Sequence, residues 1–138
     1  MEDRLLKVLA DNRHGVVVAL KRDGRPQLSN VSYTYDQDTR RIRVSIRDGL
    51  AKTANLRRDP RVSLYATAPD FRAYVVAEGD ATLSPVAAAP DDPVVTELID
   101  LYTAIAGPHP DWDDYRTAMV RENRIVLTIQ VNRVYGMA

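Results

Sequence analysis

The residues best suited to chemistry are a lysine and a threonine that follow a strand with one cationic face. Residues 41–47 alternate between apolar and polar side chains, which predicts a half-buried β-strand. Asp48-Gly49 interrupts the alternation and can cap a short helix from about residue 50 to residue 58. Ala51, Lys52 and Thr53 then fall in its first turn, where backbone N–H groups lack partners and the helix dipole is positive.

This arrangement favours an anion such as a phosphate. Lys52 adds a positive charge and Thr53 a hydroxyl donor, while Ser45 lies on the polar face of the strand between Arg43 and Arg47. Arg57 and Arg58 follow later in the helix, which Asp59-Pro60 ends because the residue before proline avoids helical backbone. The alternative interpretation is an ordinary solvated basic face.

The composition excludes several classes of protein. The 138 residues suit one domain, and the 19 lysines and arginines balance 19 aspartates and glutamates, which argues against a nucleic-acid or membrane binder. The chain has no cysteine, and His14 and His109 lie far apart, so we expect no disulfide, thiolate chemistry or metal site. No apolar run could span a bilayer and Met1-Glu2-Asp3 does not begin a signal peptide, so we expect a soluble cytoplasmic protein.

The elements that must position these residues follow from the hydrophobic pattern. A short helix at the start of the chain should end near Asn12. Residues 85–90 should form a linker, followed by one helix that starts after Asp91-Asp92 and a second that starts after Asp111. Gly79 suggests a bulge or a close backbone approach. Six strands are predicted, at residues 15–20, 27–35, 40–47, 61–67, 73–84 and 124–134. In hairpin order they indicate a small antiparallel barrel of the α+β class, one domain over residues 1–138, without free sheet edges.

No sequence pattern supplies an evident acid, base or nucleophile. The acidic residues around Trp112 are best explained as the start of a helix. The strand at residues 27–35 carries polar groups on both faces, so it should face something besides a dry core. Four tyrosines on the predicted strands can pack on a barrel wall or flank a planar ligand: Tyr33, Tyr35, Tyr65 and Tyr74. An anion site without catalytic side chains fits a protein whose chemistry belongs to a bound cofactor.

Several segments together resemble the pyridoxamine-phosphate-oxidase-like flavin-binding split β-barrel family, over about residues 5–136. They are residues 24–31 (GRPQLSNV), 44–46 (VSI), 51–62 (AKTANLRRDPRV), 78–79 (EG), 110–116 (PDWDDYR) and 133–136 (RVYG). More narrowly, the chain resembles the actinobacterial branch of this family that uses the deazaflavin coenzyme F-420. The resemblance implies a six-stranded antiparallel split barrel with short flanking helices, assembled as a homodimer with cofactor sites at the interface.

The resemblance also implies roles for individual residues. Lys52 and Thr53 would hold the cofactor phosphate together with Ser45. The ring system would lie along Pro26, Gln27 and Asn30, and Tyr74 would come from the other subunit. Two departures from the family pattern stand out, since relatives often carry arginine in place of Leu50 and tryptophan near Phe71-Arg72. Either Arg47 or Arg57 would replace the missing arginine, or the affinity for phosphate would be lower. Without the tryptophan, the chain has no evident residue at Phe71-Arg72 for substrate stacking.

The sequence therefore predicts an oxidoreductase that transfers a hydride from reduced F-420 to a conjugated small-molecule acceptor. The polyglutamate tail of F-420 would meet the arginines around the phosphate, Arg43, Arg47, Arg57 and Arg58, whereas FMN has no such tail. The alternatives are an FMN-dependent oxidoreductase on the same fold and a non-catalytic F-420 carrier. No nucleic acid, membrane or metal partner is expected.

Overall fold

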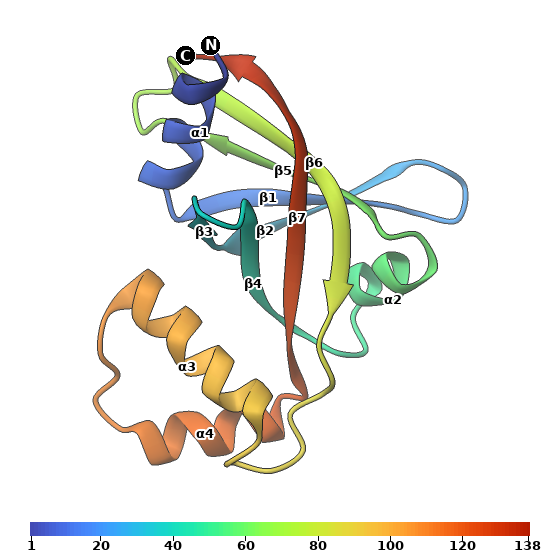
Figure 1. The fold of residues 1–138 in the computed structure, drawn as a ribbon. Helices are drawn as coiled ribbons and strands as arrows, with labels where there is room; N and C mark the ends of the chain where they lie inside the picture. Colours follow the sequence, from blue (N-terminus) through green and yellow to red (C-terminus); the bar gives the residue numbers. More distant parts are fainter.

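The computed structural model describes residues 1–138 as one curved sheet with four helices (Figure 1). The strands are β1 (His14–Leu20), β2 (Pro26–Ser32), β3 (Thr34–Asp36), β4 (Arg41–Arg47), β5 (Arg61–Thr67), β6 (Tyr74–Leu83) and β7 (Arg124–Met137). The helices are α1 (Glu2–Asp11), α2 (Ala51–Arg58), α3 (Pro93–Ala106) and α4 (Trp112–Arg121). The predicted α+β antiparallel split barrel is confirmed.

The sheet is a half-barrel with two free edges. Its order is β2-β1-β5-β6-β7-β4-β3, and every neighbouring pair is antiparallel. The expected hairpin order is therefore wrong at two places, because β4 pairs with β7 and β5 pairs with β1. The expectation that the barrel removes all sheet edges is also wrong, since β2 and β3 each have one unpaired side.

The predicted strand at residues 27–35 is in fact two strands, so the sheet has seven strands rather than six. Tyr33 separates them because it is fully buried and bound to the first helix and the loop that follows. Its hydroxyl donates to the Leu9 carbonyl oxygen at 2.7 Å, and its backbone N–H donates to the Arg13 carbonyl oxygen at 2.8 Å. The chain leaves β1 at this point and crosses to β4 as β3.

Two apolar cores hold these elements together. Alternate strand residues such as Ile42, Leu64 and Ile129 fill the half-barrel, and Leu9 of α1 packs among them. A smaller core lies between α3, α4 and the start of β7, built around Leu98, Tyr115 and Val126. The two helices thus form a hairpin that stands beside β4 and β7, as Figure 1 shows.

Two local expectations have different outcomes. Gly79 marks a register shift between β6 and β7, and a Cβ there would lie 1.9 Å from the Gln130 carbonyl oxygen, so the expected bulge and close backbone approach are confirmed. The expected cap of α2 by Asp48 or Gly49 is wrong. Leu50 is the N-cap residue and has no polar side chain to cap the helix, and the Asp48 carboxylate accepts from Arg57 instead.

One face of the sheet keeps apolar side chains in contact with solvent. We call it the outer sheet face; it runs across β2, β1, β5, β6 and β7, where residues paired in register place their side chains on the same side. Leu28 is 62% exposed and Met137 is 61% exposed. The partly exposed members include Val16, Tyr65, Tyr74 and Val76. No helix is both long and apolar enough to cross a membrane.

Candidate functional site

A cleft of about 630 Å³ separates the sheet from the helical hairpin. We call it the anion cleft, for the charges described below. The sheet side contributes Asn30, Val31 and Ser32 of β2, Ser45 of β4, Lys52 of α2 and Arg124 of β7, and the remaining lining residues belong to α3, α4 and the loops that flank α4. The structure thus brings together three residues that the sequence nominated at separate positions, Asn30, Ser45 and Lys52.

Lys52 is the residue of the cleft that is best placed to hold an anion. Its side chain is half-buried in the first turn of α2, and neither a carboxylate nor any hydrogen-bond acceptor pairs with its ammonium group. Burial and the positive charge of Arg124 lower the pKa of Lys52. The protein does little to offset the desolvation free energy of this half-buried ammonium group. An anionic ligand would offset it by pairing with the charge.

Arg124 is the functional candidate that sequence reasoning missed. It starts β7, and its guanidinium donates twice to one carboxylate oxygen of Glu122, at 2.9 and 3.0 Å. Arg47 donates to the same oxygen at 3.0 Å. These hydrogen bonds and charges outweigh the effect of burial and leave the pKa of Glu122 below its usual value. Arg47 and Arg124 thus share the carboxylate of Glu122, while Lys52 nearby has no carboxylate partner.

Thr53 acts differently from the sequence expectation. Its side chain is fully buried, and its hydroxyl donates to the Arg47 carbonyl oxygen at 2.6 Å. The hydroxyl hydrogen is therefore used in a hydrogen bond at the end of β4 and is not available to a ligand. The contact fixes α2 against β4 and so places Lys52 beside Ser45, while the unpaired backbone N–H groups of Ala51 and Lys52 remain in the first turn.

The four arginines expected around the phosphate do not form one cluster. Arg43 lies 3.8 Å from Glu97 of α3, and Arg47 pairs with Glu122. Arg57 pairs with Asp48, and Arg58 donates to the Leu20 carbonyl oxygen at 2.6 Å on the side of β1. None of these four arginines lines the anion cleft.

The edge strand β2 connects the cleft with the helix that carries Lys52. The Gln27 side-chain oxygen accepts from the Asn55 amide of α2 at 2.9 Å, so β2 and α2 lie side by side. Pro26 starts the strand and is exposed, and Asn30 further along reaches the anion cleft. Pro26, Gln27 and Asn30 therefore lie along one free edge, although only Asn30 lines the cleft.

Aromatic rings form part of the hairpin wall of the cleft. Tyr102, His109 and Tyr115 line the cleft, and Trp112 packs against all three with centroid distances of 5.6–5.9 Å. The Tyr115 hydroxyl donates to the Leu98 carbonyl oxygen at 3.0 Å, and burial raises its pKa to about 12. Asp111 caps α4 as predicted, by accepting from the Asp114 backbone N–H at 3.1 Å.

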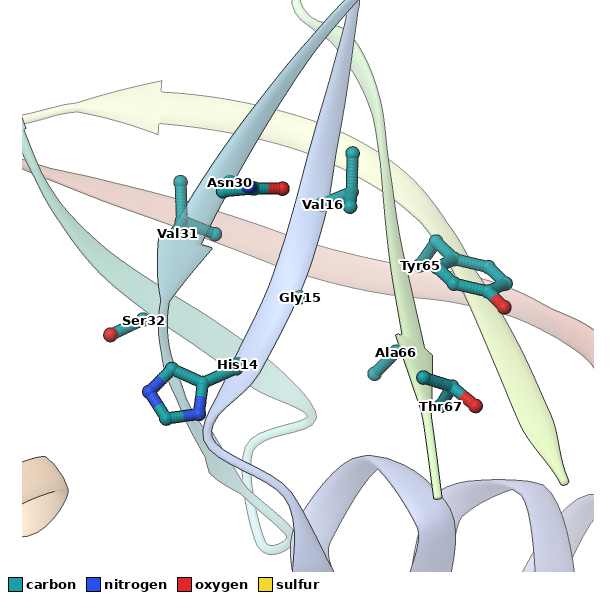
Figure 2. Close-up of a pocket in the computed structure, with 9 residues that line it drawn as sticks. All are labelled: His14, Gly15, Val16, Asn30, Val31, Ser32, Tyr65, Ala66 and Thr67. Atoms are coloured by element: carbon teal, nitrogen blue, oxygen red, sulfur yellow. The ribbon is translucent and has the colours of Figure 1, made fainter. Parts of the chain in front are cut away.

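A second cavity, of about 530 Å³, opens on the outer sheet face (Figure 2). It is lined by His14, Gly15 and Val16 of β1, Asn30, Val31 and Ser32 of β2, and Tyr65, Ala66 and Thr67 of β5. Tyr74 lies on the same face, with its ring 5.8 Å from that of Tyr65, but does not line the cavity. A Tyr74 contributed by a second subunit stays a prediction.

The two departures from the family pattern both lie at the surface. Leu50 is 43% exposed at the start of α2, and Arg124 supplies a cation to the cleft from another strand. Phe71 is 77% exposed, and its backbone φ of 64° is unfavourable for a bulky residue. Neither Phe71 nor Arg72 lines either cavity of the site.

Comparison with known proteins places these features in a family context. The family model described as pyridoxamine 5'-phosphate oxidase matches residues 1–138. Among solved structures, the chain is similar to an F-420 reductase at 18% identity and a TM-score of 0.72, with 94% of each chain covered.

Other similar structures carry different descriptions. A FAD-binding protein from Mesorhizobium loti matches at 19% identity and a TM-score of 0.68, with 99% of this chain and 91% of that chain covered. A heme storage protein from Vibrio cholerae matches at 12% identity and a TM-score of 0.70, with 99% and 94% covered. At these identities, the similarity is evidence for the fold alone.

Proposed function

Because the chain belongs to the pyridoxamine 5'-phosphate oxidase family, we propose that it is an oxidoreductase that binds coenzyme F-420 through the phosphate of the cofactor. The observation that carries the proposal is the half-buried, unpaired ammonium of Lys52 in the first turn of α2. An F-420 reductase of the same fold and nearly the same length supports the choice of cofactor.

The residues present fit such a group. Lys52 and Arg124 would hold the phosphate, with Ser45 and the first N–H groups of α2 as further donors. Gln27 and Asn30 on the edge strand would lie along the ring system. The bound, reduced cofactor would supply a hydride to a conjugated acceptor, while the protein binds, orients and shields the reactants.

We further propose that two copies of the chain assemble through the outer sheet face. Leu28, Val76, Tyr135 and Met137 leave apolar surface in contact with solvent on one continuous face, which a second copy would cover. A two-fold arrangement would also wall off the second cavity and bring Tyr74 of the partner subunit towards it.

The main alternative is FMN, which presents a phosphate and a similar ring without a tail. The pairing of Arg43 and Arg47 with Glu97 and Glu122 favours this alternative, because these arginines are partly neutralised within the chain. A carrier of F-420 without catalytic activity would use the same anion cleft.

The test is a titration of the protein with F-420, FMN and FAD. Trp112 is the single tryptophan of the chain and packs against the wall of the cleft, so its fluorescence reports binding directly. We expect F-420 to bind most tightly and its reduced form to support turnover of conjugated acceptors. Tighter binding of FMN together with turnover only with FMN would establish the alternative cofactor. Tight F-420 binding with no turnover of any acceptor would establish the carrier.

A further inference from the structure

The cavity on the outer sheet face adjoins the anion cleft along the free edge strand. Asn30, Val31 and Ser32 of β2 line both of them. A ligand whose anionic group lies in the cleft would therefore reach the mouth of the second cavity by crossing β2. The second cavity is in the right place for a compound that must contact this ligand.

The two cavities differ sharply in charge. The anion cleft is lined by Lys52, Asp114, Glu122 and Arg124, whereas the nine residues of the outer cavity include no aspartate, glutamate, lysine or arginine. An ion transferred into the outer cavity would lose hydration without gaining a counter-charge. The outer cavity therefore suits an uncharged ligand.

Polar side chains gather on the β1–β2 side of this cavity. His14 pairs with Ser32 in the β1–β2 register and Val16 pairs with Asn30, so all four side chains lie on the same face. Figure 2 shows the His14 ring beside Ser32 and the Asn30 amide pointing towards Val16. These groups can donate hydrogen bonds to a carbonyl oxygen, while Val16 and Tyr65 contact the apolar part of a ligand.

His14 is the one lining residue with an imidazole, the side chain that serves most often as a general acid. Its exposed imidazole takes part in no hydrogen bond within the chain, so both ring nitrogens are free. The neighbouring Arg13 points elsewhere, because its guanidinium donates to the Ala10 and Asn12 carbonyl oxygens at 2.7 and 2.9 Å. Tyr65, on the apolar side of the cavity, is the other titratable lining residue.

We propose that the outer cavity is the acceptor subsite, that it takes an uncharged α,β-unsaturated carbonyl compound, and that His14 is the proton donor. This inference rests on the proposed oxidoreductase function. The hydride from the reduced cofactor forms a C–H bond at the β-carbon and breaks the C=C π bond. The His14 side chain gives a proton to the resulting enolate, and a water molecule that enters the cavity returns a proton to the ring. The acceptor gains one hydride, which carries two electrons, and one proton, and the cofactor is oxidised by two electrons.

The binding test needs no cofactor, because the chain has only two histidines and each lines one cavity. The Cε1–H signals of His14 and His109 are assigned in proton NMR with the His14→Gln and His109→Gln variants. Cyclohex-2-en-1-one should shift the His14 signal and leave that of His109 in place, and inorganic phosphate should do the reverse. An enone that moves neither signal, or only that of His109, overturns the acceptor subsite. A shift of His14 with enone but none with phosphate upholds the subsite and refutes the anion site instead.

The catalytic test uses the full-length protein with reduced cofactor. His14→Ala should lower kcat/KM for the enone by about 100-fold, within the range for loss of a general acid. Added imidazole should restore part of the rate, which a purely structural defect would not allow. Lys7→Ala, at an exposed residue of α1 that lines neither cavity, is the control and should keep its enone activity. Full activity of a folded His14→Ala variant, shown to be folded by its phosphate-dependent shift of His109, would refute the role of His14.

Discussion

Lys52 and Arg124 line the same cleft, where burial and the nearby charge of the arginine both lower the pKa of the lysine. Glu122 holds Arg124 through two hydrogen bonds, but no carboxylate pairs with Lys52. Two cations from α2 and β7 are thus held together in the absence of a ligand. Electrostatic repulsion of this kind is expected where a protein is organised to bind an anion.

The affinity for a phosphate-bearing cofactor should depend on Lys52. Lys52→Ala should weaken binding by about 1.5–3 kcal/mol, the range for a hydrogen bond to a charged group. Isothermal titration calorimetry with F-420 and FMN measures the loss. Lys7→Ala is the control, since Lys7 is exposed on α1 and pairs with Asp11. Equal affinities of the Lys52 variant and the parent protein would remove Lys52 from the site.

The same lysine should destabilise the ligand-free fold. Its pKa is lower in the folded protein than in the unfolded chain, so the unfolded chain binds more protons between these two values. Stability should therefore rise as pH increases from the folded pKa towards the unfolded pKa near about 10.4. Lys52→Met should therefore raise Tm at pH 7, by a small amount because solvent screens part of the charge. Calorimetry without ligand checks this, and a lower Tm for Lys52→Met would contradict it.

The stability of the fold at acidic pH should depend on whether Glu122 is ionised. The pKa of Glu122 is lowered in the folded protein, so its contribution is present above the unfolded value of about 4.3 and is lost as pH falls through the folded pKa. Glu122→Gln should lower Tm at pH 7 and flatten the dependence of Tm on pH below about 5. Asp91→Asn, at an exposed acid without an ion-pair partner, serves as the control. An unchanged acid slope in the Glu122 variant would show that this carboxylate does not hold the two arginines.

Assembly through the outer sheet face predicts a specific sensitivity to charge. Val76→Arg places a cation in the centre of this face, between the registers of Tyr65 and Tyr135. Sedimentation should show a dimer for the parent protein and a monomer for the variant, with weaker cofactor binding. Thr96→Arg on the exposed side of α3 is the control and should remain a dimer. A parent protein that is monomeric at micromolar concentration and still binds cofactor tightly would contradict this proposal.

A cofactor tail should add affinity only modestly. Arg43 and Arg47 already pair with carboxylates, so each contact with a tail glutamate should contribute a few tenths of a kcal/mol, up to about 1. F-420 with a long tail should therefore bind slightly more tightly than F-420 with a short tail at low salt, and the difference should shrink as salt is added. FMN should show a weaker salt dependence. Equal affinities for the two tail lengths at low salt would show that these arginines do not meet the tail.

The sequence by itself determined the local features of the site. Alternation in residues 41–47 assigned Ser45 to the face opposite Ile42, Val44 and Ile46, and those three residues are buried in the structure. The interruption at Asp48-Gly49 and the stop at Asp59-Pro60 located α2 within one residue and placed Lys52 in its first turn. Such features depend on neighbouring residues, because the side-chain period of a strand and the capping of a helix are properties of short segments.

Only the tertiary structure decided which distant residues meet. Arg124 reaches the Ser45 carbonyl oxygen at 3.4 Å because β7 pairs with β4, and the sequence predicted neither this pairing nor the role of Arg124. The Thr53 hydroxyl donates to the Arg47 carbonyl oxygen rather than to a ligand. The arginines of the expected cluster pair with different carboxylates, as Arg43 with Glu97 and Arg57 with Asp48. The physical reason is that strand order and ion pairing depend on the packing of the whole sheet and its helices, to which elements far apart in the chain contribute together.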